Sequence, residues 1–231
     1  MKAIIILFCL MSFSYVNAQE ISGKIKGHKK AEMDVVLMPF GMDNWISIGK
    51  VNKKGEFTAD LGLAKIDGVS EELLSVSTGV LYFSFYFSCS DNGKFGEHTE
   101  KPAMRQDYVR LTKGGQWAGT AFLVSDEGLI PWLEDSGYKN AIQGSFYEVI
   151  YVEEDLILDF TCHDQVPITS EDIVETVYRF KIDLKKGFNW VEYTIQDVYE
   201  TNPDVRASFP SKVLISNVQD PTKMQWIGKY Y

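Results

Sequence analysis

The sequence predicts a mostly β protein, built as one or two packed antiparallel β-sandwiches with little helix. Aromatic residues, which strands favour, make up 13% of the 231 residues, whereas Pro, which strands disfavour, occurs only 7 times. Apolar and polar side chains also alternate along many short segments, as they do in a strand with one buried face. With 45% hydrophobic and 24% charged residues, the composition excludes a disordered or collagen-like chain.

Residues 1–18 have the pattern of a secretory signal peptide. Lys2 is followed by an apolar run at 3–11 and by a polar stretch that ends in Val16-Asn17-Ala18. The apolar run is too short for a membrane-spanning helix, which needs about 20 apolar residues. We therefore expect cleavage after Ala18 and an exported mature protein, periplasmic or secreted, that begins at Gln19 and has no membrane span.

The charge of the chain argues against nucleic acid as a partner. The sequence has 23 Lys and Arg against 32 Asp and Glu, which gives a net charge of −9. A field of this sign repels a phosphate backbone. The densest basic groups are short, at His28-Lys29-Lys30, Lys53-Lys54 and Lys185-Lys186, and we interpret them as solvated turns.

Residues 19–76 are predicted to form a small N-terminal β-sandwich-like domain. Four short strands are expected, at 21–26, 35–40, 45–51 and 57–61. The last two flank a turn in which Gly55 supplies the positive φ of a tight hairpin. Residues 64–76 are expected to include one short helix, with Ser70 as its N-cap and the acidic Glu71 and Glu72 in its first turn.

Three motifs of this segment together resemble a known module: ISGKIKG at 21–27, DVVLMPF at 34–40 and ISIGKVNKKGEF at 46–57. The pattern is similar to the carboxypeptidase-regulatory-like (transthyretin-like) β-sandwich found at the start of many secreted bacterial proteins. The resemblance implies a sandwich fold and an accessory or adhesive role, and it implies no catalytic residue. The motif FKIDLKKGFNWVEYTI at 180–195 likewise resembles a segment of uncharacterised exported bacterial proteins and implies no activity.

Residues 77–231 are predicted to form a second, mostly antiparallel β domain, which begins with the clearest strand pattern in the chain. Leu81, Phe83, Phe85, Phe87 and Cys89 occupy alternate positions, which predicts a core strand with these side chains on its buried face. The intervening residues, Tyr82, Ser84, Tyr86 and Ser88, are expected on the opposite face.

The rest of the second domain is expected to consist of hairpins. One pairs 146–152 with 156–162 around an acidic tip, and another pairs 178–184 with 191–195 around Lys185-Lys186-Gly187. Strands at 117–124, 213–218 and 224–230 complete the sheet. Residues 94–116 show no sustained period, and Pro131 and Gly137 interrupt the segment 129–144.

Two cysteines, Cys89 and Cys162, remain after the expected cleavage. Each lies on the predicted apolar face of its strand. The compartment of an exported protein permits a disulfide. The sequence gives the side on which each sulfur lies but not the distance, and a bridge needs Cα atoms within about 7 Å. Two alternatives therefore stay open: one disulfide, or two buried free thiols.

Only Cys162-His163-Asp164 brings a nucleophile, a base and a carboxylate together in the sequence. Strand alternation places Cys162 inward and His163 outward, which favours a strand end over a catalytic pair. The chain has no serine-hydrolase elbow, zinc motif or phosphate-binding loop, and the acidic segments 97–100 and 153–155 lack metal-ligand spacing. We therefore assign no catalytic, cofactor-binding or metal residue.

Trp45 and Trp132 lie beside Asn44 and Pro131, near expected turns, and are the first candidates for stacking on a sugar or a peptide.

The leading functional hypothesis is a non-catalytic binding or structural β module whose partner is a protein or a glycan. One alternative is a secreted carbohydrate-binding accessory protein. The other is a hydrolase whose site the sequence does not reveal.

Overall fold

The computed structural model describes residues 19–231 except 42–43, 169–172, 203 and 205. The predicted signal peptide, 1–18, lies outside the described residues, and its cleavage stays a prediction. The described residues form fourteen strands, two α-helices and five short 3-10 helices, which confirms a mostly β protein. The strands build a closed barrel joined to an open sheet, and not a clear antiparallel sandwich.

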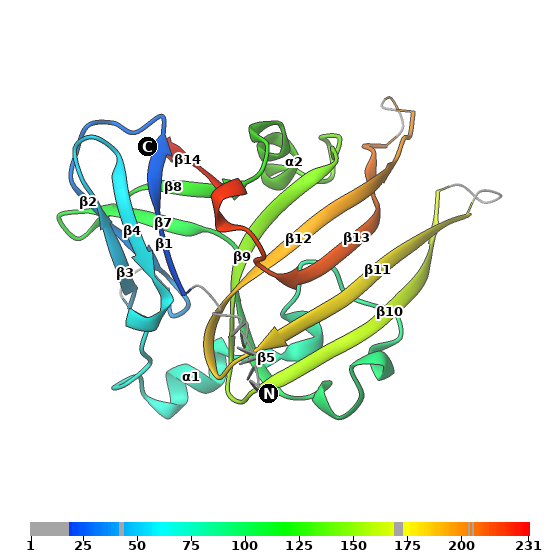
Figure 1. Cartoon of the computed structure of the whole chain (residues 1–231). Coiled ribbons are helices and arrows are strands. Elements are labelled where there is room, and N and C mark those ends of the chain that lie inside the picture. Colours follow the sequence, from blue (N-terminus) through cyan, green and yellow to red (C-terminus); the bar gives the residue numbers. More distant parts are fainter. Residues whose placement is uncertain (1–18, 42–43, 169–172, 203, 205) are drawn as a thin grey trace, which may run out of the picture.

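Seven strands close into the barrel, which lies at the left of Figure 1. In pairing order they are β8 (Gln116–Val124), β14 (Gln225–Tyr230), β1 (Glu20–Lys26), β4 (Glu56–Asp60), β3 (Ile46–Val51), β2 (Met33–Leu37) and β7 (Val109–Lys113). Pairing of β7 with β8 closes the ring. Neighbouring strands are antiparallel except β1 and β14, which are parallel.

The barrel combines both predicted domains. Strands form at all four places expected in 19–76, as β1 to β4, but they share the barrel with β7, β8 and β14 from 77–231. The barrel interior is filled by alternate side chains of each strand, such as Ile21 and Ile25 of β1 and Phe57 and Ala59 of β4. The N-terminal strands therefore bury their apolar face against strands that come much later in the chain.

The remaining strands form an open sheet beside the barrel. Its order is β10 (Leu156–Pro167), β11 (Ile173–Leu184), β13 (Phe209–Asn217), β12 (Gly187–Tyr199), β9 (Gly144–Val152), β6 (Pro102–Gln106) and β5 (Gly79–Val80). All pairs are antiparallel except β11 with β13. A single pairing of Val124 with Phe146 joins β8 of the barrel to β9 of the sheet.

Both hairpins predicted in the C-terminal half are wrong in their pairing, although their strands exist. β9 pairs with β12 and β6, while β10 pairs with β11. β13 lies between β11 and β12 and pairs with both. β11 and β12 are therefore not hydrogen-bonded to each other. Figure 1 shows β9 and β10 diverging from their shared turn. Alternation identifies a strand, but it does not identify the partner of that strand.

The predicted core strand at 81–89 is also wrong. Leu81–Phe83 is a 3-10 turn, closed by a 2.9 Å hydrogen bond from Ser84 N to Leu81 O. Phe83 is 71% exposed, while Phe85 and Phe87 are buried. This segment lies across the face of the open sheet instead of pairing within it, and its backbone is held by side chains of the sheet: Tyr86 N donates to Tyr193 Oη over 3.1 Å.

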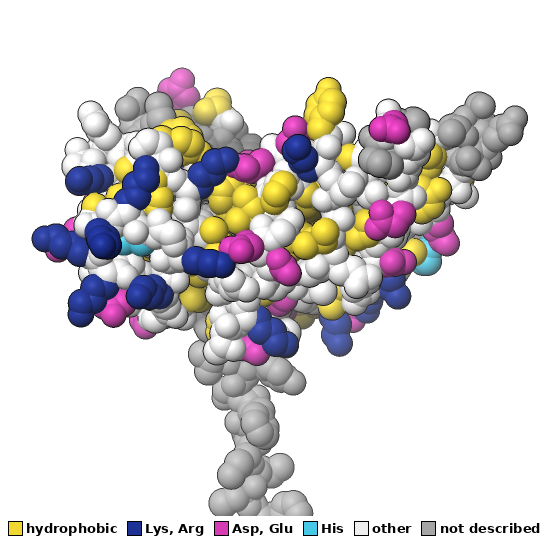
Figure 2. All heavy atoms as spheres, turned by 90° about the horizontal axis from the view of Figure 1, so that it is seen from above, with side chains coloured by type: hydrophobic (Ala, Val, Ile, Leu, Met, Phe, Trp, Pro, Cys, Tyr) yellow, Lys and Arg dark blue, Asp and Glu magenta, His cyan; other side chains and the backbone are white. Residues whose placement is uncertain are grey.

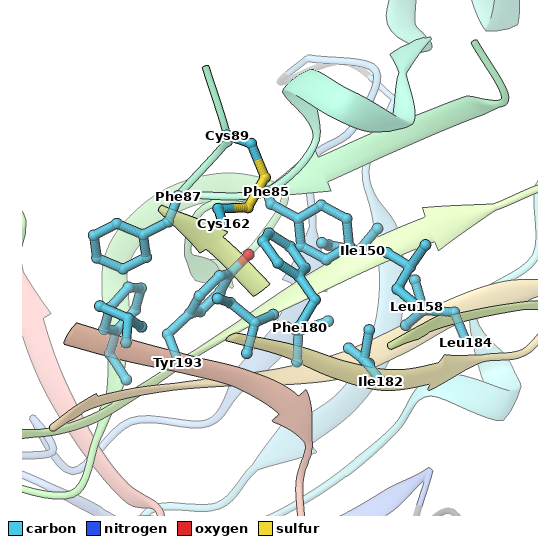
Figure 3. Close-up of a cluster of buried hydrophobic side chains, with 14 of the residues drawn as sticks. Phe85, Phe87, Cys89, Ile150, Leu158, Cys162, Phe180, Ile182, Leu184 and Tyr193 are labelled. Carbon is cyan, nitrogen blue, oxygen red and sulfur yellow. A yellow bond between two sulfur atoms is a disulfide. The ribbon is translucent and has the colours of Figure 1, made fainter. Parts of the chain in front are cut away.

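A disulfide between Cys89 and Cys162 fastens this segment to β10, with the two Cα atoms 5.6 Å apart. Figure 3 shows the bridge beside a cluster of buried aromatic and aliphatic side chains. Phe85 packs edge-on against Phe180 of β11 at 5.2 Å between ring centres. The adjacent Ser90 donates to both carboxylate oxygens of Asp164 in β10. The segment is thus a lid over the core of the open sheet.

The predicted short helix forms as α1 (Glu71–Ser77), and Ser70 caps it, because its Oγ accepts from Leu73 N over 3.2 Å. The second helix, α2 (Ile130–Glu134), follows a 3-10 turn and carries Trp132. Neither helix, nor any other in the described part of the chain, is long and apolar enough to cross a membrane.

Candidate functional site

The Cys162-His163-Asp164 group is divided among three separate structural contacts. Cys162 is in the disulfide and has no thiol to act as a nucleophile. His163 Nδ1 lies 2.8 Å from Glu175 Oε1 on an exposed edge. Asp164 accepts from the Ser90 backbone. The three residues lie within β10, which continues to Pro167, so the expected strand end is wrong, and the three side chains do not form a catalytic group.

Of the two tryptophans expected to stack on a ligand, Trp132 is buried. It is 2% exposed and packs against Tyr86 and Phe146, with ring centres 5.5 and 5.9 Å away. The hypothesis of an exposed platform at Trp132 is therefore wrong, because α2 turns the indole into the core of the open sheet. Trp45, just before β3, is half-buried.

The exposed tryptophan is Trp117, at the tip of the hairpin between β7 and β8. Gly114 and Gly115 form its two-residue loop, and both have positive φ, at 57° and 77°. A turn of this kind needs positive φ at both central residues, which glycine adopts without steric cost. The tight loop places Trp117 opposite Thr112, with Arg110 two residues further along β7.

Trp117 and Tyr231 form an exposed aromatic corner. Their ring centres are 5.0 Å apart and their planes meet at 66°. Trp117 is 43% exposed and Tyr231 is 71% exposed. The indole is fixed in orientation because its Nε1 donates to Gly119 O over 2.7 Å. The backbone N of Tyr231 donates to Ala118 O over 3.2 Å, which holds the second ring beside β8.

Arg110 adds a cation to this corner. Its guanidinium carbon lies 5.5 Å from the centre of the Trp117 ring and 5.0 Å from that of Tyr108, so the two rings flank it. Its Nη1 is buried and has no hydrogen-bond partner among the described residues. Burial lowers the pKa of Arg110, while Asp107 and Tyr108 oppose that shift. We call Arg110, Trp117 and Tyr231 the aromatic–arginine platform.

Tyr108 contacts the platform through the guanidinium of Arg110. Its hydroxyl donates to Leu133 O of α2 over 2.7 Å, and its ring packs on Phe122 of β8 at 5.0 Å. Burial, followed by the nearby Tyr86 and Asp107, raises the pKa of Tyr108 to about 12. The phenol is therefore neutral and stays a hydrogen-bond donor at physiological pH.

A buried ion pair lies next to the platform, where the chain passes from β6 to β7. Arg105 of β6 donates two hydrogen bonds of 2.9 Å to Glu148 of β9, and its guanidinium lies 4.7 Å from the centre of the Tyr86 ring. Arg105 Nε is also 3.1 Å from Asp107. Burial raises the pKa of Glu148 to about 7, against the opposing effect of Arg105. Only 3% of the Glu148 side chain is exposed.

No sequence motif singles out Trp117, Arg110 or Tyr231 as a binding site. One local signal was present: Gly114-Gly115 marks a hairpin tip directly before Trp117. The approach of Tyr231 to that tip depends on β14 pairing with β8, and no local pattern encodes this pairing.

Within the described part of the chain, no group of three or more His, Cys, Asp and Glu side chains is placed to hold a metal ion. Comparison of the chain with family models, with curated proteins and with solved structures finds no match.

Proposed function

We propose that this protein is an exported, non-catalytic binding module that recognises a glycan through the aromatic–arginine platform. The single observation that carries the proposal is the exposed pair of rings Trp117 and Tyr231, which lie 5.0 Å apart beside the Arg110 guanidinium.

The platform fits the chemistry of a sugar. The faces of sugar rings carry C–H groups that stack on indole and phenol rings, while hydroxyl and carboxylate oxygens accept from a guanidinium. The fixed orientation of the Trp117 indole reduces the entropy lost on binding. Because Arg110 is a cation, sugars that carry a carboxylate are expected to bind more tightly than neutral ones.

Glu148 favours binding over hydrolysis. A carboxyl group with a pKa near 7 is typical of a general acid. However, both oxygens of Glu148 accept from Arg105, and its side chain is almost completely buried, so a substrate cannot reach it. Glu148 therefore has a structural role, although its pKa is suited to a general acid.

Export is supported by the pattern of residues 1–18 and by the Cys89–Cys162 disulfide, since such bridges persist in oxidising compartments. We propose that the mature chain begins at Gln19. Mass measurement of the protein released from intact cells tests this point, and a product that keeps residues 1–18 would contradict it.

The binding function is tested by calorimetric titration with a panel of neutral and uronic-acid oligosaccharides. We expect at least one oligosaccharide to bind, and we expect Trp117→Ala to weaken that binding at least tenfold. Phe83→Ala is the matched control, because Phe83 is an exposed aromatic residue that lies outside the platform. Failure of every oligosaccharide to bind, or equal losses in the two variants, would overturn the proposal.

A further inference from the structure

Two lysine-bearing turns meet at one end of the barrel and line an open hollow of about 860 Å³. We call it the basic hollow. One turn follows β1 and the other joins β3 to β4. Figure 2 shows the Lys and Arg side chains gathered over the barrel end of the molecule. The charged and titratable side chains that line the hollow are all basic: Lys24, Lys26, His28, Lys30, Lys53 and Lys54.

The two turns are fixed to each other through Gly55. Its carbonyl accepts from Ile25 N over 2.8 Å. Its φ of 83° lies in the region that favours glycine, and a Cβ at this position would lie 3.0 Å from His28 Cβ. The close approach of the two backbones brings together lysines that are separated in the sequence.

His28 holds the first turn in place. Its Nε2 lies 2.7 Å from Ala31 O, and its Nδ1 lies 2.7 Å from Tyr230 Oη of β14. A carbonyl only accepts, so Nε2 carries a proton. In the same turn, Lys30 adopts a φ of 55°, the one positive value of a non-glycine residue in the described ranges. Such a conformation persists where the surrounding structure enforces it.

The charge of the basic hollow is only partly compensated by the protein. Lys26 pairs with Glu127 at 2.6 Å and Lys53 approaches Glu32 at 3.9 Å. Lys24, Lys30 and Lys54 form no ion pair with any described residue. This concentration of positive charge stands out in a chain whose net charge is −9. Mutual repulsion of the lysines is relieved when an anion lies among them.

We propose that the basic hollow binds a small, multiply charged anion that carries tetrahedral oxyanion groups, phosphate or sulfate. Ammonium groups bind such groups as point charges, and a hollow lined by several lysines suits a ligand with more than one oxyanion group. The volume is in the range of small-molecule sites. Lysines from two separate segments of the chain line the hollow, so a compact ligand within it can contact several of them at once. This site is independent of the aromatic–arginine platform.

The test is calorimetric titration of the chain with tripolyphosphate at low ionic strength, where screening is weakest. We expect saturable binding that Lys24→Gln/Lys54→Gln weakens at least tenfold. Lys94→Gln/Lys139→Gln is the matched control: it removes the same charge from exposed lysines outside the hollow and should bind tripolyphosphate as the unmodified chain does. Both pairs are exposed, so neither double variant disturbs the core.

Competition with sodium sulfate distinguishes the two oxyanions, and either order of affinity supports the site. Trp117→Ala should leave tripolyphosphate binding unchanged, so the failure of the glycan proposal and the failure of this one are separate results. Absence of tripolyphosphate binding would overturn the inference. Equal weakening in the two double variants would do so too, and so would binding to phosphatidylglycerol vesicles without binding to tripolyphosphate.

Discussion

Arg105 and Glu148 form a paired ionic contact inside the molecule, with two hydrogen bonds of 2.9 Å from one guanidinium edge to one carboxylate. Arg105 belongs to β6 and Glu148 to β9, so the contact joins two neighbouring strands of the open sheet. From Arg105 the chain continues directly into β7, where Arg110 lies. The ion pair therefore anchors the strand that leads to the platform.

Loss of one partner of this pair should be strongly destabilising. At about pH 8, above the Glu148 pKa of about 7, Arg105→Met leaves the ionised Glu148 buried without its cation, and removal of one member of a buried pair costs about 3 to 5 kcal/mol. The free energy of unfolding in urea measures the effect. Lys101→Met is the control, because it breaks an exposed pair with Glu154 at 2.6 Å and should leave the stability nearly unchanged. Equal effects in the two variants would contradict a buried pair.

The stability of the protein should fall as pH rises through the range in which Glu148 ionises. The folded-state pKa of Glu148 is raised from 4.5 to about 7, so the native state holds a proton that the unfolded state has released. Protonated Glu148 contributes its full stabilisation of the folded state below about pH 4.5. This stabilisation is lost as the pH rises to about 7, and the loss reaches up to about 3 kcal/mol. Urea unfolding at several pH values measures this slope.

Glu148→Gln carries no titrating group at this position, and its stability should be less dependent on pH in the same range. The variant keeps the size of the side chain, so a change in slope reports on ionisation and not on packing. A slope that persists unchanged in Glu148→Gln would assign the pH dependence to another group.

Phe85 and Phe83 should differ sharply in their contribution to stability, although the sequence places them on one face of a strand. Phe85 is 3% exposed and packs against Phe180, so Phe85→Ala should cost about 3 to 5 kcal/mol. Phe83 is 71% exposed, and Phe83→Ala should change the stability by less than about 0.5 kcal/mol. Denaturant midpoints compare them directly, and similar losses would restore the strand interpretation.

Local alternation located most of the strands, because the side-chain period of a strand is a property of the strand alone. It failed at 81–89, where the same period occurs in a segment that lies across the sheet and where Phe83 faces solvent. Alternation also does not predict which strands pair. β13 pairs with both β11 and β12, and this arrangement depends on contacts between segments that are distant in the sequence.

The candidate sites depended on the same long-range information. Trp132 has a turn-like sequence context, but its indole is buried because α2 packs onto the open sheet. Trp117 is exposed at a hairpin tip and acquires Tyr231 only through the pairing of β14 with β8. In the sequence, Lys24 lies in a strand, whereas Lys30 and Lys54 belong to two solvated turns. The three share a hollow because β1 and β3 end at the same end of the barrel.

The Cys89–Cys162 disulfide should stabilise the protein without taking part in binding. The bridge joins residues 73 positions apart. In the chain-entropy model, a loop of this length contributes up to about 4 kcal/mol by restricting the unfolded chain. Cys89→Ala/Cys162→Ala should lower the free energy of unfolding towards this limit. Thiol labelling of the mature protein, which lacks residues 1–18 and therefore Cys9, in denaturant without reductant should detect no free thiol.

The double cysteine variant should still bind any ligand of the platform or of the basic hollow below its unfolding temperature. Cys162 lies in the core of the open sheet, whereas Trp117 and Lys54 lie on the barrel. Loss of the bridge should therefore loosen the lid at 81–89 before it affects either site. Two labelled thiols per unmodified chain would exclude the bridge. Loss of binding in a folded double variant would show that the lid and the barrel are coupled, contrary to this assignment.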